Sequence, residues 1–298
     1  MQHSSPDLSR ITPDVLAHLR RWEGRSETVN DRATLAPARG LAATLDRPDD
    51  PATGAALPPL WHWLYFLPRA PQRDLGADGH PRLGGFLPPV PLPRRMWAGG
   101  RVQWHAPLRI GDEIRRTTRI VSVTHKAGRT GDLVFVLLRH EIAGSGAPAL
   151  TEEQDIVYRA PAQPGDPAPA PQAAPGGSTW SREIVPDPVL LFRYSALTFN
   201  GHRIHYDRPY ATGVEGYPGL VVHGPLIATL LVDLARRERP QARMTGFSFK
   251  AVRPTCDPHP FRVCGEPSAD GTGARLWAVD HEGWQTMQAD IRFEQESP

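Results

Sequence analysis

Alternating apolar and polar residues recur in two blocks of the chain, one before residue 160 and one after residue 240. Alternation with a period of two is typical of strands that bury one face. In the first block it predicts strands at Glu113–His125, Asp132–Ile142 and Gln154–Arg159. In the second block it predicts strands at Phe261–Cys264, Ala274–Asp280 and Trp284–Phe293, with Asp270-Gly271 as a hairpin turn.

A helical period is clear at two places. Thr12 can cap a helix that opens with Pro13, and apolar residues then follow at helical spacing as far as Trp22. The second helix, Pro225–Arg237, has so broad an apolar face that other elements must nearly enclose it. The strands after it can form a curved sheet around it, which indicates an α+β fold.

The two blocks resemble diverged copies of one unit. Gly100–Asp112 is similar to Gly246–Asp257, because each runs from a strand-like stretch through a Pro to a turn that ends in Asp. Between the copies, residues 161–177 are rich in Pro and Ala and lack apolar periodicity, which is typical of an extended linker. We therefore expect an N-terminal domain at 1–160, a linker at 161–177 and a C-terminal domain at 178–298.

Composition excludes several classes of function. The chain has 298 residues, of which 40% are hydrophobic and 22% charged, as in globular proteins, and its net charge of +2 favours neither nucleic acid nor a membrane surface. It has no signal-peptide pattern and no apolar run of about 18 residues, so we expect a cytoplasmic protein. Cys256 and Cys264 are too few for a disulfide framework and are not part of a motif with a partnered base, which favours a structural role.

Candidate chemistry is concentrated between Tyr194 and Gly224. His205 can exchange a proton near neutral pH, and the amide of Asn200, five residues earlier, can hold a water or orient the imidazole. His223-Gly224 leads directly into the apolar helix, whose first N–H groups can stabilise an oxyanion. One loop can therefore bring His205 to the start of that helix.

The run Asn200-Gly-His-Arg-Ile-His205-Tyr-Asp207, followed by Ala211 and His223-Gly224, resembles the motif of MaoC-like hydratases and dehydratases. With Arg94–Arg101, it is most similar to mesaconyl-C4-CoA (3-methylfumaryl-CoA) hydratases and to mitochondrial-type 3-hydroxyacyl-thioester dehydratases. The resemblance implies a double hotdog, in which each half is a curved antiparallel sheet wrapped around a central helix. The N-terminal half lacks the catalytic motif, so it would serve as a partner surface and help to hold the CoA moiety.

The resemblance also implies reversible syn addition of water to a 2-enoyl-CoA, without a cofactor. His205 would act as the general base, Asn200 would position the water, and the Gly224 N–H would stabilise the thioester enolate. The wider family has Asp at the position of Asn200, and Asn cannot accept a proton. Proton delivery to Cα would then pass through His205 or through water held by Asp207.

Arg203, Asp207 and His223 are the expected substrate-binding residues. Arg203 lies beside the catalytic pair and could bind a second carboxylate of the substrate in a bidentate fork. His223 is expected to cap or buttress its turn. A metal site made of His202, His205 and His223 would lack a fourth ligand and is not expected.

Three functions remain open. The first is hydration of a short branched dicarboxylic ester, mesaconyl-C4-CoA or itaconyl-CoA, to citramalyl-CoA. The second is dehydration of 3-hydroxyacyl thioesters of CoA or acyl carrier protein in fatty-acid synthesis. The third is a non-catalytic acyl-CoA-binding module, against which the intact set of Asn200, His205 and Gly224 argues. We further expect Trp61, Trp63 and Tyr65 to form a packed strand or an acyl-pocket wall, and the chain to form a homodimer.

Overall fold

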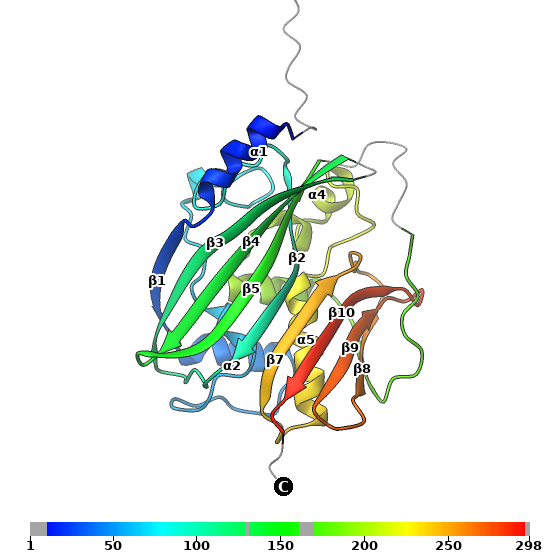
Figure 1. The fold of residues 1–298 in the computed structure, drawn as a ribbon. Coiled ribbons are helices and arrows are strands. Elements are labelled where there is room, and N and C mark those ends of the chain that lie inside the picture. Colours follow the sequence, from blue (N-terminus) through cyan, green and yellow to red (C-terminus); the bar gives the residue numbers. More distant parts are fainter. Residues whose placement is uncertain (1–10, 129–130, 161–169, 296–298) are drawn as a thin grey trace, which may run out of the picture.

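An antiparallel sheet dominates the computed structural model, which describes residues 11–128, 131–160 and 170–295 (Figure 1). Its strands are β1 (Ser26–Arg32), β2 (Arg94–Trp104), β3 (Glu113–Gly128), β4 (Gly131–Gly144), β5 (Ala147–Arg159), β6 (Trp180–Ile184), β7 (Met244–Ala251), β8 (Phe261–Pro267), β9 (Gly273–Val279) and β10 (Gln285–Phe293). The order across the sheet is β1-β3-β4-β5-β2-β7-β10-β9-β8-β6. Each half of the chain therefore supplies one half of the sheet.

The two halves meet at β2 and β7, the strands that contain the two similar stretches of sequence. Gly100 of β2 lies opposite Phe249 of β7, and Gln103 lies opposite Gly246. A Cβ atom on Gly100 would lie 3.1 Å from the Phe249 ring, so the glycine makes room for an aromatic side chain at the seam. The two copies are thus joined strand to strand into one continuous sheet.

The helix predicted at Pro225–Arg237 is confirmed as α5 (Gly224–Glu238). Figure 1 shows it against the strands of the C-terminal half. It packs against β6, β8, β9 and β10, and every residue from Leu226 to Ala235 is buried. Asp233 is the one acid in this buried run, and its side chain is 1% exposed. The guanidinium groups of Arg182 and Arg237 donate to it at 3.1 and 2.8 Å, so the buried carboxylate is compensated.

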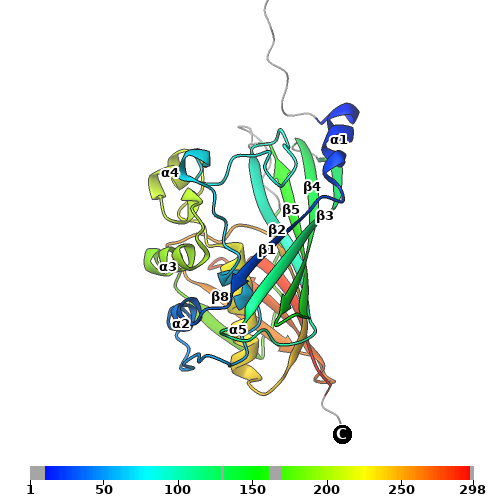
Figure 2. The ribbon, with the colours of Figure 1, turned by 90° about the vertical axis from the view of Figure 1, so that its left-hand side faces the viewer.

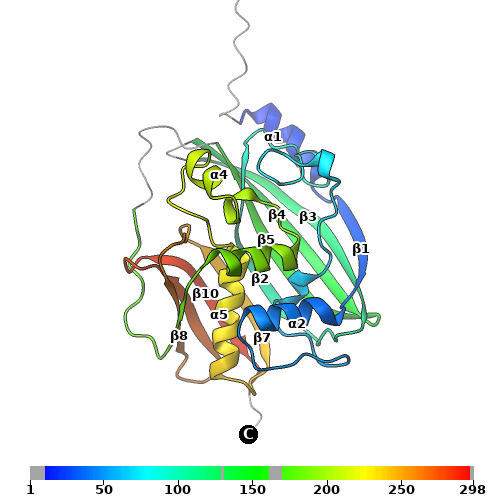
Figure 3. The same ribbon diagram turned by 180° about the vertical axis from the view of Figure 1, so that it is seen from behind.

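The remaining helices are short. They are α1 (Pro13–Leu19), α2 (Leu35–Thr44), α3 (Pro188–Thr198) and α4 (Arg208–Gly213), with 3₁₀ turns η1 (Arg20–Trp22), η2 (Trp61–Leu64), η3 (Gln72–Asp74) and η4 (Arg203–His205). Figures 2 and 3 show α2, α3 and α4 as a layer on the same side of the sheet as α5. None of these three helices was predicted, although Asp187-Pro188 carries a cap signal: the Asp187 side chain accepts from the Leu190 N–H at 2.8 Å.

The N-terminal half differs from the expected pattern of a sheet wrapped around a long helix. Its helix α2 has 10 residues, against 15 in α5, and its main contacts are with α3 and η2. The sheet face of this half carries a row of buried polar residues instead. Thr118, His140 and Glu152 lie side by side on β3, β4 and β5. A cavity occupies the space in front of this row.

The predicted strands and the Thr12-capped helix are confirmed, and the Asp270-Gly271 turn joins β8 to β9. The strand expected at Trp61–Tyr65 is wrong, because Leu60 has a left-handed φ of 68° and the chain turns there into η2. Trp61 is buried in the core, whereas Trp63 and Tyr65 do line the cavity. Much of the expected linker, residues 161–169, lies outside the described residues. Among the described helices, none is long and apolar enough to cross a membrane.

Candidate active site

A cavity of about 1640 Å³ lies between the sheet of the N-terminal half, the layer of short helices and the start of α5. Four of the six residues singled out in the sequence line it: Asn200, Arg203, His205 and Gly224. More of the lining residues come from the N-terminal half than from the C-terminal half. A space that both halves enclose is where a ligand of this chain would bind.

The loop after α3 positions Asn200. Phe199 ends the helix in a left-handed conformation with φ of 49°, and the Asn200 N–H then donates to the Ser195 carbonyl at 2.8 Å. The side-chain oxygen of Asn200 accepts the His202 N–H at 3.0 Å. Because this bond fixes the oxygen, the amide NH₂ is left to donate to a water in the cavity.

His205 is held as a neutral base. Its Nδ1 lies 2.7 Å from the Val221 carbonyl oxygen, and since a carbonyl only accepts, Nδ1 carries the proton. The other ring nitrogen, Nε2, then has a free lone pair. Burial lowers the pKa of His205 to about 4, with a smaller lowering by His80 and an opposing effect of the Val221 bond. His205 therefore has the tautomer and charge of a general base at neutral pH.

His223 supports His205 through ring stacking. The two rings stack with centroids 3.7 Å apart and planes inclined by 19°. His223 Nε2 lies 2.8 Å from the Ser195 hydroxyl, and its side chain is buried and does not line the cavity. Burial holds the pKa of His223 well below its usual range. This position fits the expected buttressing role and does not support direct contact with substrate.

Gly224 is the first residue of α5 and lies at the cavity wall. A Cβ atom here would meet nothing within 4 Å, so space is open in front of the backbone. The first N–H groups of a helix have no intrahelical acceptor, and the dipole adds positive potential there. Two strand-like bonds hold the approach to the helix: Val221 N–H to the Ile204 carbonyl and Val222 N–H to the Thr255 carbonyl.

Arg203 and Asp207 bind each other. Both Nε and Nη2 of Arg203 donate to one Asp207 oxygen, at 2.9 and 2.7 Å, and Nη1 donates to the Ala77 carbonyl at 3.0 Å. The guanidinium also lies 4.0 Å from the Tyr210 ring centroid. Asp207 caps α4 through the Tyr210 N–H and does not line the cavity. Arg203 would have to leave these partners to bind a substrate carboxylate.

The N-terminal half brings residues to the site that the sequence had not singled out. Asp78 and His80 lie beside His202, and ligand-type atoms of the three residues are all within 4.8 Å of one another. Arg95 also lines the cavity, near His202 and Tyr158. Asp78 and His80 are an acid and a base two positions apart. No local pattern in the sequence indicated that they would lie near His205, more than 120 residues away.

One wall of the cavity contains both aromatic and polar side chains. Trp63, Trp97 and Phe249 form edge-to-face pairs. Beside them, Glu152 accepts from Trp63 Nε1 at 2.9 Å and pairs with His62 Nε2 at 3.0 Å. Burial alone would raise the pKa of Glu152, but the bond from His62 lowers it to about 2. The wall thus contains a compensated buried charge and is not uniformly apolar.

Comparison with known proteins identifies the family of this chain. The profile of the hydroxyacyl-thioester dehydratase type 2 family matches residues 60–257. The mesaconyl-C4-CoA hydratase of Chloroflexus aurantiacus is 54% identical over 253 residues, which cover 84% of this chain and 89% of that protein.

Solved structures agree with the predicted fold. A MaoC-like dehydratase from Phytophthora capsici has a TM-score of 0.67 at 13% identity, covering 95% of this chain and 99% of its own. A double hotdog protein from Mycobacterium tuberculosis has a TM-score of 0.55 at 15% identity, covering 92% of this chain and 96% of its own. The fold is the predicted double hotdog, and the chain belongs to the hydroxyacyl-thioester dehydratase type 2 family, whose named members here are hydro-lyases.

Proposed function

We propose that this protein reversibly adds water to a 2-enoyl-CoA thioester, with a short branched dicarboxylic ester such as mesaconyl-C4-CoA as substrate and citramalyl-CoA as product. One observation carries the proposal. His205 presents an unprotonated Nε2 in the same cavity as the N-terminal end of α5. A base for water and a donor for a thioester oxygen are the two groups that hydration requires.

The reaction follows from these positions. His205 Nε2 removes a proton from a water held by the Asn200 amide, while the water oxygen bonds to Cβ of the enoyl thioester. The electron pair of the double bond moves towards the thioester oxygen, where the Gly224 N–H stabilises the enolate. A proton then reaches Cα and restores the carbonyl. In the reverse direction the same groups eliminate water.

Two features support a dicarboxylic substrate. The relative from Chloroflexus aurantiacus is named for mesaconyl-C4-CoA and is 54% identical over most of both chains. In addition, Arg95 lines the cavity near His202 and has no carboxylate partner among the described residues. A guanidinium without a carboxylate partner is suited to bind the free carboxylate of such an ester. We therefore assign this role to Arg95 in preference to Arg203.

Dehydration of longer 3-hydroxyacyl thioesters is the second candidate. It is favoured by the volume of the cavity, about 1640 Å³, because a five-carbon acyl group fills a small part of that space. The same residues would perform that reaction. A pure acyl-CoA-binding module is disfavoured, since binding alone needs no positioned, unprotonated His205.

The test is mass spectrometry of CoA esters after incubation with the purified protein. The panel contains mesaconyl-C4-CoA, itaconyl-CoA, crotonyl-CoA and a long-chain 2-enoyl-CoA. We expect the dicarboxylic esters to gain one water with wild-type protein and to stay unchanged with His205→Gln. Hydration of the straight-chain esters alone would instead favour the second candidate, and no turnover of any ester would refute both.

The organisation of the chain also remains a proposal. We propose that residues 1–160 and 178–298 are the two hotdog domains, joined by the linker at 161–177, and that only the second carries the base. We further propose a cytoplasmic homodimer. The strands β1 and β6 form the two edges of the sheet and offer unpaired backbone groups for association. Light scattering of the purified chain, which would give twice 32.9 kDa for a dimer, tests the last point.

A further inference from the structure

The proposed reaction lacks one group. Hydration needs a base for the water and an acid for Cα, and His205 supplies the first. Asn200 cannot carry a proton, and Asp207 caps α4, pairs with Arg203 and does not line the cavity. Neither Asn200 nor Asp207 can therefore supply the acid for Cα.

The N-terminal half brings such a group into contact with the loop that carries Asn200 and His205. The Asp78 carbonyl accepts the Arg203 N–H at 2.9 Å, and the Ala77 carbonyl accepts Arg203 Nη1 at 3.0 Å. Gly79 has a φ of +87°, and a Cβ atom on it would collide with the Gly201 carbonyl oxygen. Only glycine permits so close an approach of the two backbones. The loop that carries Asp78 and His80 is thus docked in a defined position.

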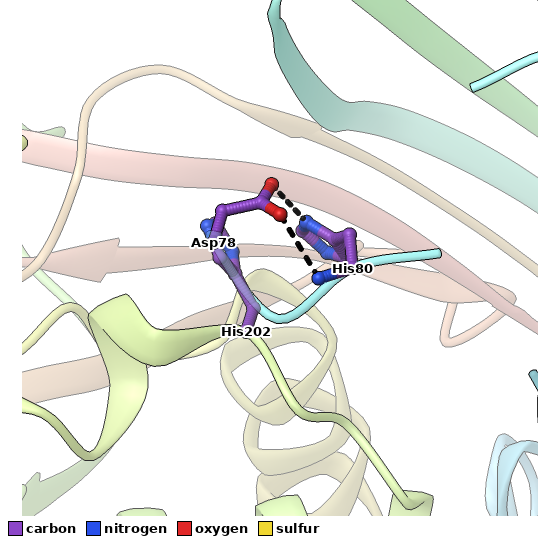
Figure 4. A group of neighbouring side chains, drawn as sticks. All are labelled: Asp78, His80 and His202. Atoms are coloured by element: carbon purple, nitrogen blue, oxygen red, sulfur yellow. Dashed lines mark hydrogen bonds and ion pairs between the residues drawn. The ribbon is translucent and has the colours of Figure 1, made fainter. Parts of the chain in front are cut away.

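Asp78 and His80 form an oriented pair (Figure 4). The Asp78 carboxylate accepts the His80 backbone N–H at 3.0 Å through one oxygen and lies 3.0 Å from His80 Nδ1 through the other. With Nδ1 engaged, Nε2 of His80 is left to exchange a proton. Burial alone would raise the pKa of Asp78, but the bonds from His80 lower it to about 2, so the carboxylate is charged and can stabilise an imidazolium.

The pair reaches towards His205 through His202. The rings of His80 and His202 lie with centroids 4.0 Å apart, and those of His202 and His205 lie 5.4 Å apart. Burial, with a smaller contribution from His80, lowers the pKa of His202 to about 2, so His202 is a neutral spacer. The His80 side chain is 25% exposed, which allows it to regain a proton from solvent. Asp78, His80, His202 and His205 all line the cavity.

We propose that His80, positioned by Asp78, is the second acid–base residue of the site and exchanges the proton at Cα of the acyl thioester. This inference rests on the proposed function. His205 Nε2 takes one proton from water as the oxygen bonds to Cβ, and His80 Nε2 gives one proton to Cα as the enolate returns to a carbonyl. His205 then releases its proton to solvent and His80 takes one up. The sum is the addition of one water.

A bound metal ion is the competing interpretation of the same residues. The spacing of Asp78, His80 and His202 would allow it. Both Asp78 oxygens, however, already accept hydrogen bonds from His80, and one of these bonds engages His80 Nδ1. The geometry as it stands is that of a carboxylate–imidazole pair.

The test compares His80→Gln with wild-type protein in both directions, using mesaconyl-C4-CoA for hydration and citramalyl-CoA deuterated at Cα for dehydration. We expect kcat to fall by about 10²–10⁴-fold with KM changed by less than about threefold, the range for loss of a general acid. The deuterium isotope effect on kcat should rise, because the Cα step becomes rate-limiting. Asp78→Asn should also raise the deuterium isotope effect but should lower kcat less, since Asp78 only positions His80.

His125→Gln is the matched control. His125 pairs with Asp132 at 2.9 Å and is 22% exposed, much like His80 with Asp78, but it does not line the cavity. Its activity should equal that of the wild type. Imidazole added to His80→Ala should restore part of the rate, which a fold defect would not allow.

Activity of the wild type on any ester of the panel tests the proposed function independently of the role of His80. If the wild type hydrates an ester and His80→Gln retains its kcat within twofold, or raises KM alone, the role of His80 is refuted while the proposed function stands. Loss of wild-type activity in a chelator, restored by Zn²⁺, would also overturn it in favour of a metal site.

Discussion

The imidazole of His223 lies flat against that of His205, with ring centroids 3.7 Å apart. His223 is in turn fixed by the Ser195 hydroxyl, 2.8 Å from its Nε2. The base of the proposed reaction is therefore held on one side by a carbonyl bond and on its face by a second, buried histidine. His223 itself does not line the cavity.

Ser195→Ala should weaken both stability and catalysis. Removal of the hydroxyl leaves His223 Nε2 buried without a partner, which costs about 1–3 kcal/mol. Because His205 packs on His223, kcat should fall by about tenfold or more while KM changes little. Urea unfolding and steady-state kinetics measure the two effects. Thr212→Ala, which removes an exposed hydroxyl that bonds to the Arg208 carbonyl, should change neither.

The pH dependence of activity should show an unprotonated His205 over the whole neutral range. Its pKa is lowered to about 4, so the fraction in the base form falls only as the pH drops towards that value. We expect the base-dependent limb of kcat/KM for hydration near pH 4, measured in overlapping buffers with rapid assays. An acid limb near pH 6.5 in the wild type would contradict the assigned protonation state.

Stability should decrease on the acid side for the same reason. In the unfolded chain His205 binds a proton below about pH 6.5, whereas in the folded chain it does so only near 4. Between these values the unfolded state holds more protons, so stability falls as the pH falls through this window. Melting temperatures from pH 7 to 4.5 test this. His205→Gln should flatten the slope, and the exposed His18→Gln should leave it unchanged.

Arg95→Gln should distinguish substrates by their charge. Loss of a charged hydrogen bond worth about 1.5–3 kcal/mol would raise KM for mesaconyl-C4-CoA by about 10–100-fold. Crotonyl-CoA has no second carboxylate, so its kinetics should stay within about threefold of wild type. Arg203→Gln is the comparison, because that side chain is already paired with Asp207 and should affect both esters alike. Equal losses on both esters in Arg95→Gln would assign Arg95 to another part of the ligand.

Asp233→Ala should destabilise the fold without changing the site. It would leave Arg182 and Arg237 without their buried carboxylate, a loss of about 3–5 kcal/mol of unfolding free energy. Asp49→Ala is the control. Asp49 pairs with Arg47 and Arg236 with its side chain 39% exposed, so less than about 1 kcal/mol is expected. Denaturant titration measures both, and an unchanged KM would confirm that the cavity is intact.

The strands and α5 could be predicted because their signals are local and strong. Alternation indicates which face of a strand is buried, and α5 has a broad apolar face at helical spacing. The helix α3 was missed because its exposed Val189 and Phe192 blur the helical period. At Trp61, alternation predicted a strand, but the left-handed turn at Leu60 directs the chain into a 3₁₀ turn.

The site was predictable only in its C-terminal part. Asn200, His205 and Gly224 belong to one short stretch, so a sequence motif contains them together. Asp78 and His80 reach the same place through backbone contacts between Gly79 and Gly201, 122 positions apart, which no local pattern records. Arg203 was a reasonable carboxylate ligand from its position in the sequence, but its pairing with Asp207 is a property of the folded loop.

The strand pairing of β2 with β7 joins the two copies as two identical subunits would join across a symmetry axis. A symmetric pair of that kind would hold two equivalent reaction centres. In this chain α5 fills the inner face of one copy, while the matching face of the other is open and lines the cavity. Divergence of the two copies would thus have removed one reaction centre and enlarged the cavity of the other. One chain should accordingly bind one equivalent of substrate at saturation.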